Sequence, residues 1–433
     1  MTRMQLILIL LRCAALSIIT GAALYLESPL TVDKPRAPMH LTTPSTPIPA
    51  SYFGIHVHHP SPESWPQIPA TEWRLWDSAG TVWYDLEPRQ GQWDFSQLDR
   101  DVAMAEEHHV GLLLTLGQSP PWASSRPKDP PAWRLGGPAP PTSEEDWKSY
   151  VRRVAVRYQG RIHAYEVWNE ANLTEFYTGT PEQLVALARD AYGIIHNVDP
   201  QALVVSPAIT GAYGVSWFRH YLELGGGQYA DVIGYHFYAS PEPPEASIAT
   251  ILHVREAMRT YGLENKPLWN TETGYSITSN FGAVNPATGS LSRVVSQPEA
   301  LGYVMRDYLV NWASGVSRLY WYDWDGNGMG LGDNQGKQKK IPAYGYAIIS
   351  QWLVGATMKR CDRDNDGTWI CELTRDHRTE WIVWNEERAG TVTLSASWQV
   401  TEIDSMSQSG SITGQKLRPG ADISYSPLPS LIR

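Results

Sequence analysis

The sequence predicts an α/β fold, a (β/α)8 TIM barrel with a small β-sandwich domain at its C-terminal end. Eight short apolar segments alternate with polar or helical stretches between residues 52 and 324, as in a parallel sheet joined by crossover helices. After about residue 355 the pattern changes to short alternating segments, which are typical of antiparallel strands. A barrel occupies roughly 250 residues, so a chain of 433 residues has room for a second domain.

The chain is expected to have four parts. Residues 1–30 hold the apolar run MQLILILLRCAALSIITGAALYL and predict a signal peptide or a membrane anchor, two alternatives that the sequence leaves open. Residues 31–50 are rich in Pro and Thr and predict a linker without packed structure. Residues 51–355 form the predicted barrel, and residues 356–433 form the predicted accessory sandwich. We therefore expect an exported protein, periplasmic or envelope-associated, either anchored or secreted.

Eight segments are the predicted barrel strands: 52–58, 71–77, 110–117, 162–170, 202–208, 231–238, 266–272 and 316–324. Two of the helices between them have clear start signals. Ser143 is a predicted N-cap, followed by apolar residues at helical spacing up to Gly160. Thr180, Pro181 and Gln183 form a predicted capping box with proline at the first helical position.

The C-terminal part carries two cysteines, Cys361 and Cys371, on either side of a polar turn between two predicted strands. Outside the cytoplasm this arrangement predicts a disulfide. Trp369, Trp381 and Trp384 lie in the same part. They are explained either by packing or by a carbohydrate-binding role.

Composition excludes one class of partner. The net charge is −10 and 18% of the residues are charged, whereas a nucleic-acid surface needs clustered Lys and Arg. The chain has 19 Trp and 22 Tyr but only 6 Phe, and aromatic rings with a polar group suit both a core and the faces of sugars. We expect a polysaccharide or oligosaccharide as partner, no nucleic acid, a possible inner-membrane association through the N-terminal segment, and a monomer.

Two carboxylic acids end the fourth and seventh predicted strands, Glu170 in YEVWNE and Glu272 in WNTE. The carboxyl ends of barrel strands meet at one rim, where barrel enzymes assemble their sites. Two carboxyl groups about 5 Å apart can hydrolyse a glycosidic bond with retention, because one protonates the leaving oxygen and the other attacks the anomeric carbon. The sequence therefore predicts a retaining glycoside hydrolase with these two catalytic acids.

These motifs carry a family resemblance. Through RLWDSAGTVWYDLEPRQGQWDF, EVWNEANL and WNTETGY, the sequence resembles the clan A glycoside hydrolases, most closely family 39. Its layout is similar to the Psl-type hydrolases found with bacterial exopolysaccharide synthesis genes. The resemblance implies that Glu170 is the acid/base and Glu272 the nucleophile of a double displacement. The export segment, the Pro/Thr-rich spacer and the excess of Trp and Tyr over Phe further predict that an extracellular or biofilm polysaccharide is cut internally.

Further site residues follow from their places at strand ends. By resemblance, Asn169 donates to the sugar 2-hydroxyl. Arg74 ends the second strand and would keep Glu272 ionised. His236 and Tyr238 end the sixth strand, and the tyrosine hydroxyl could position Glu272.

Aromatic and rim residues complete the predicted substrate-binding set. Trp321 or Trp324, after the eighth strand, is the expected platform under the reacting sugar, and spacing does not choose between them. His58, Trp76 and Trp122 are further rim candidates that packing explains equally well.

Two alternative functions stay open, and a third is disfavoured by the residues at two strand ends. An exo-acting β-xylosidase or a non-catalytic polysaccharide-binding protein of an export system would use the same barrel. His56, His58, His236 and Asp323 could form a metal set of the amidohydrolase kind, but this needs His or Lys at the ends of the fourth and fifth strands, which read VWNE and VVSPA. We therefore expect neither a metal nor a cofactor.

Overall fold

The computed structural model describes residues 37–129, 134–278, 293–326, 328–394, 398, 400–418 and 420–433. The predicted signal peptide or anchor lies outside the described residues, as does the first part of the predicted linker. No helix in the described part of the chain combines the length and apolar character that crossing a membrane requires.

Eight parallel strands form the barrel, in the order β6-β5-β4-β3-β2-β11-β8-β7. Isolated parallel bridges, Val205 with Val232 and Thr210 with His236, connect the two outer strands and close the ring. The prediction of a (β/α)8 barrel is confirmed. The strands are β2 (Phe53–His56), β3 (Glu72–Leu75), β4 (Gly111–Leu116), β5 (Ala164–Val167), β6 (Leu203–Val205), β7 (Ile233–Tyr235), β8 (Leu268–Thr273) and β11 (Arg318–Trp321).

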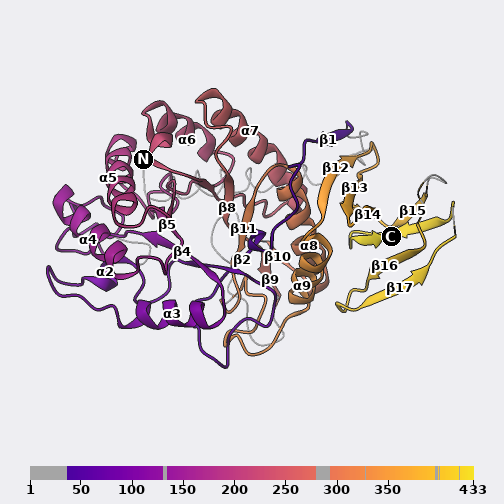
Figure 1. The fold of residues 1–433 in the computed structure, drawn as a ribbon, viewed down its shortest axis with the longest axis horizontal. Helices are drawn as coiled ribbons and strands as arrows, with labels where there is room; N and C mark the ends of the chain where they lie inside the picture. Colours follow the sequence, from indigo (N-terminus) through magenta and orange to yellow (C-terminus); the bar gives the residue numbers. More distant parts are fainter. Residues whose placement is uncertain are drawn as a thin grey trace, which may run out of the picture.

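Helices surround the strands (Figure 1). Ser143 caps α4 by accepting from Asp146 N, and Thr180 and Gln183 form the capping box of α5, so both predicted starts are confirmed. The helices are α2 (Trp83–Leu86), α3 (Ser96–Glu107), α4 (Glu144–Arg157), α5 (Pro181–Val198), α6 (Gly214–Glu223), α7 (Ser247–Thr260), α8 (Gln297–Ala313) and α9 (Ile341–Leu353), with short 3-10 turns at Ala50–Tyr52, Gly226–Tyr229 and Pro244–Ala246.

The strict alternation of strand and helix is broken once. The connection 57–71 between β2 and β3 contains no helix. Its sequence, VHHPSPESWPQIPAT, holds four prolines, and each removes a backbone donor and disfavours a helix at the residue before it. A parallel crossover without a helix results.

The C-terminal strands form an antiparallel seven-stranded sheet, β1-β12-β13-β14-β19-β16-β17, beside a two-stranded sheet, β15-β18. Figure 1 shows them next to α8 and α9, consistent with the predicted sandwich. Their bounds are β12 (Thr357–Arg363), β13 (Thr368–Arg375), β14 (Arg378–Asn385), β15 (Gly390–Thr393), β16 (Glu402–Met406), β17 (Ile412–Lys416), β18 (Asp422–Tyr425) and β19 (Ser430–Ile432). Two further short strands, β9 (Ser276–Ile277) and β10 (Val294–Val295), pair with each other.

Neighbouring side chains of β14 face opposite ways, as a strand requires. Trp384 packs in the main core with Trp369 and donates through Nε1 to Glu245 Oε1 at 2.8 Å, which ties the sheet to the barrel. Trp381 points into a separate small core of the C-terminal domain. Packing therefore accounts for these indoles. Cys361 and Cys371 stand opposite each other on β12 and β13 and form the predicted disulfide.

The linker prediction is wrong for its described part. Strand β1 (Met39–Leu41) pairs with β12, and Leu41 is buried. Ile48 is also buried, and its backbone N–H donates to Ala356 O at 2.9 Å. The edge of the seven-stranded sheet offers free backbone groups, which a short extended segment can satisfy even among prolines.

Candidate active site

A left-handed turn carries Glu170 at the end of β5. Trp168 has φ 75° and Glu170 has φ 42°, conformations that are costly for bulky residues and that persist where packing enforces them. The Trp168 ring is buried, and its Nε1 donates to Phe176 O at 2.7 Å. This packing holds the turn and fixes the position of the Glu170 carboxyl group.

The carboxyl groups of Glu170 and Glu272 meet at the rim. One oxygen of each acid and a ring nitrogen of His236 all lie within 4.8 Å of one another. Each acid keeps 10% of its side chain exposed, so a substrate can reach both. The separation fits the roughly 5 to 5.5 Å of retaining glycosidases, whereas inverting enzymes need a wider gap for a water molecule.

Glu272 accepts two hydrogen bonds from donors in the barrel. Arg74 Nη1 donates to Oε2 at 2.7 Å, and the Tyr238 hydroxyl donates to Oε1 at 2.8 Å. Burial raises the pKa of Glu272, and the neighbouring His236 and Arg74 oppose the shift. Burial also lowers the pKa of His236 to about 4, so the ring is neutral at neutral pH. Arg74 is then the lasting counter-charge that favours the Glu272 carboxylate.

Glu170 has a different environment. Burial raises its pKa to about 7, although a hydrogen bond with the Thr210 side chain and the charge of Arg74 oppose the shift. His236 Nδ1 lies 2.9 Å from Glu170 Oε1. Near neutral pH this carboxyl group therefore exists in both protonation states, which is what a group that gives and then takes a proton needs.

The Arg74 guanidinium also binds Glu166 of β5 and Asn169 of the turn that follows it. Its Nε and Nη2 donate to Glu166 Oε2 at 2.9 and 2.5 Å, and Nη2 also donates to Asn169 Oδ1 at 2.7 Å. Thr115 Oγ1 donates to the same Glu166 oxygen at 2.8 Å. Glu166 is not among the site residues predicted from the sequence, although a carboxylate in the middle of an apolar strand is a feature that could have identified it.

The platform prediction is wrong for both candidates. Trp321 and Trp324 are fully buried, and the Trp324 indole donates to two backbone carbonyls. Tyr322 between them is only partly buried. Its hydroxyl donates to Asp77 Oδ2 at 2.7 Å, and its ring meets the His58 ring edge-on at 5.2 Å. The aromatic residue that faces the rim after β11 is therefore Tyr322.

His58 lies between carboxylates beside Tyr322. Its Nε2 is 2.9 Å from Asp77 Oδ1 and its Nδ1 is 2.9 Å from Asp323 Oδ2. Burial alone would lower the pKa of His58, but the charge of Asp77 and the hydrogen bonds with the aspartates raise it well above its usual value. His58 is thus held as an imidazolium, with 12% of its side chain exposed.

The metal set considered from the sequence is not assembled in the described part of the chain. His236 lies with the two glutamates, whereas His58 lies with Asp323 and Asp325. The third histidine, His56, has its Nε2 3.2 Å from a backbone carbonyl of β8.

Two further rim candidates have packing contacts. Trp76 is buried with Val82 and Phe176, and the Arg74 guanidinium lies 6.0 Å from the centre of its ring. Trp122 donates through Nε1 to a backbone carbonyl at 2.7 Å and meets the Trp83 ring edge-on. The structure brings Trp76 close to Arg74, and it gives Trp122 contacts on the side of α2.

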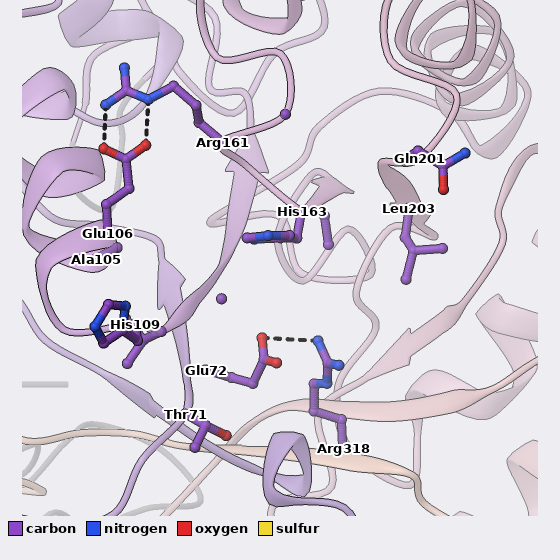
Figure 2. A pocket seen from close by; sticks show the side chains of 14 residues that line it. Thr71, Glu72, Ala105, Glu106, His109, Arg161, His163, Gln201, Leu203 and Arg318 are labelled. Atoms are coloured by element: carbon purple, nitrogen blue, oxygen red, sulfur yellow. Dashed lines mark hydrogen bonds and ion pairs between the residues drawn. The ribbon is translucent and has the colours of Figure 1, made fainter.

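A cavity, drawn in Figure 2, is lined by residues at the other end of the barrel. Its lining includes Glu72, Gly111, Ala164, Leu203 and Arg318, which are the first residues of five barrel strands. Glu72 and Arg318 form an ion pair of 3.0 Å there. Parallel strands place this cavity opposite the two acids, at the end of a barrel that serves stability.

Comparisons with known proteins agree with this geometry. Residues 137–332 match the glycosyl hydrolase catalytic core family. The chain is 24% identical over 212 residues to a β-xylosidase of Geobacillus stearothermophilus, which is 42% of each chain. It is 32% identical over 123 residues to endo-1,4-beta-xylanase 2 of Claviceps purpurea, which is 27% of this chain and 35% of that protein. The chain thus spans less than half the length of these curated relatives.

A solved structure is similar over most of the chain. It is a family 39 glycoside hydrolase from Bacteroides cellulosilyticus WH2, with a TM-score of 0.70 and 17% identity over 89% of this chain and 80% of that chain. The barrel fold and the match over residues 137–332 agree with the predicted glycoside hydrolase, and the matched segment includes both Glu170 and Glu272. The predicted similarity to family 39 hydrolases is therefore confirmed at the level of the fold.

Proposed function

We propose that this chain hydrolyses glycosides with retention, with Glu272 as nucleophile and Glu170 as acid/base. The observation that carries the proposal is the pair of rim carboxyl groups within 4.8 Å, one held by Arg74 and the other with a pKa of about 7. A Glu272 oxygen attacks the anomeric carbon while the bond to the leaving oxygen breaks and Glu170 gives that oxygen its proton. Water then attacks the same carbon, releases Glu272 and returns a proton to Glu170.

Asn169 supports this reaction through its orientation. A guanidinium can only donate hydrogen bonds, so the amide oxygen must be the atom that faces Arg74. The Asn169 amide nitrogen is then left to donate to the 2-hydroxyl of the sugar, a hydrogen bond that strengthens toward the transition state.

The stereochemistry of the product tests the mechanism. Double displacement inverts the anomeric carbon twice, so the first product is expected to keep the configuration of the substrate. Proton NMR of freshly formed product, recorded before mutarotation, measures this directly. A first product of the opposite configuration would exclude a covalent intermediate on Glu272.

We further propose that the substrate is an extracellular polysaccharide, cut internally by an exported enzyme. The support is the apolar N-terminal run, together with two long rim connections, 117–143 after β4 and 322–340 after β11, which are long enough to wall a groove that binds several sugars. The similarity to Psl-type hydrolases adds a biofilm polysaccharide as the expected class. An exo-acting β-xylosidase is the alternative, and one relative of that name favours it.

Product sizes distinguish these possibilities. With purified bacterial exopolysaccharide or with xylan, internal cleavage is expected to release mixed oligosaccharides at the earliest times and to lower viscosity quickly. Size-exclusion chromatography of a time course provides the measurement. Monosaccharide alone from the first time point would instead establish exo action.

A further inference from the structure

The loop after β6 lies against the turn that carries Glu170. Ala171 N donates to Ala208 O at 3.0 Å. Asn172 and Thr210 exchange two hydrogen bonds, Nδ2 to O at 3.1 Å and N to Oδ1 at 3.0 Å. Because Thr210 also bonds to the Glu170 carboxyl group, this loop is fixed at the side of the site that holds the proposed acid/base.

Tyr213 ends the same loop and is the most exposed large apolar side chain in the described part of the protein, at 66%. Its ring lies close to Gly211, where an added Cβ would come within 2.5 Å of Tyr213 Cε1. Gly211 has φ 73°, and its carbonyl accepts from the Tyr235 hydroxyl at 2.7 Å. The backbone beneath the ring is therefore anchored.

Tyr213 lies on the side of the site that holds Glu170. A Cβ added at Gly214, the residue after Tyr213, would lie 3.0 Å from Asn172 Nδ2, so the end of the loop that carries Tyr213 lies beside the turn that carries Glu170. In the proposed reaction Glu170 protonates the oxygen of the leaving group. A sugar that leaves must therefore lie on the Glu170 side, beyond the carboxyl group and away from Glu272.

We propose that Tyr213 is the aromatic platform of the leaving-group subsite, on which the first sugar beyond the cleaved bond stacks. This inference rests on the proposed function and names a subsite for it. The expected ligand is a neutral pyranose ring within a longer chain, because an aromatic face binds the C–H surface of a sugar and leaves its hydroxyls to water.

The test compares substrates that do and do not fill this subsite. Trisaccharides of β-linked xylose, mannose or glucose place a sugar there, whereas the matching β-glycosyl fluorides have a leaving group too small to stack and need little help from an acid. For each pair the ratio of kcat/KM, trisaccharide over fluoride, is measured. Tyr213→Ala is expected to lower this ratio about tenfold, mainly through KM of the trisaccharide, and Tyr213→Phe, which keeps the ring, by less than about threefold.

Tyr261→Ala is the matched control, because Tyr261 is another exposed tyrosine, at 37%, and follows α7 at the other end of the barrel. Tyr261→Ala is expected to give the same ratio of kcat/KM, trisaccharide over fluoride, as the natural chain. An unchanged ratio in Tyr213→Ala, or an equal loss on both substrates, would overturn the platform while leaving the hydrolase assignment standing. A natural chain that hydrolyses neither the panel nor purified exopolysaccharide would overturn the proposed function and this subsite together.

Discussion

Replacing Glu272 with alanine is expected to lower turnover of an oligosaccharide by about 10⁵-fold, the loss typical of removing a covalent nucleophile. Glu166, the other carboxylate bound to Arg74, is not expected to take over the attack, because it is fully buried and accepts from Arg74 and Thr115. Initial rates on the natural chain and the variant give the measurement.

Azide distinguishes a lost nucleophile from a damaged site. In Glu272→Ala the face of the sugar opposite the leaving group is open, so azide is expected to restore activity on an activated aryl glycoside and to give a glycosyl azide of inverted configuration. Glu245→Ala would be a poor comparison, because that residue ties the barrel to the sandwich. The exposed Glu175 on the rim is the better control, and Glu175→Ala should keep nearly normal turnover. Near-normal turnover in Glu272→Ala would contradict the assignment of Glu272 as the nucleophile.

Replacing Glu170 with glutamine is expected to lower turnover of an oligosaccharide by about 10³-fold to 10⁴-fold, the upper range for general acid–base catalysis. Its effect should depend on the substrate. A nitrophenyl glycoside has a leaving group that departs without protonation, so formation of the glycosyl enzyme should be much less impaired with it. A pre-steady-state burst of nitrophenol is expected, because water still needs the missing base in the second step.

The pH dependence of kcat/KM gives a second test of the role of Glu170. Glu170 must be protonated in the first step, so kcat/KM of the natural chain on an oligosaccharide is expected to fall as pH rises through about 7, the pKa that burial gives this carboxyl group. On the same oligosaccharide, the residual kcat/KM of the Glu170→Gln variant should lack this alkaline limb. A limb that stays in place in the variant would assign the titration to another residue.

The sequence was sufficient for several of these elements. The helix starts at Ser143 and Thr180 follow from side chains that bind the backbone N–H groups of their own first turn, and local signals of this kind need no tertiary context. The convergence of Glu170 and Glu272 was also predictable, since parallel strands in a barrel bring their carboxyl ends to one rim.

Other features depended on contacts between distant parts of the chain. The sequence WYDW offers three aromatic residues at and just after the end of the eighth barrel strand, and which of them faces the rim depends on the path of the backbone there. The structure buries Trp321 and Trp324 and presents Tyr322. Likewise, Met39–Leu41 becomes a strand only because β12 offers it an edge.

The sequence by itself determined the barrel and the two strand ends that carry acids, because apolar periodicity and chain direction are properties of the local sequence. The sequence also predicted that Arg74 favours the ionised form of Glu272, but only the tertiary structure decided the environment of Glu170. Arg74 from β3 reaches Glu272, whereas burial and the Thr210 loop after β6 set the proton affinity of Glu170. The charge state of a buried carboxyl group depends on which distant side chains and how much water surround it. The same packing of separate loops brought Tyr213 to the edge of the site.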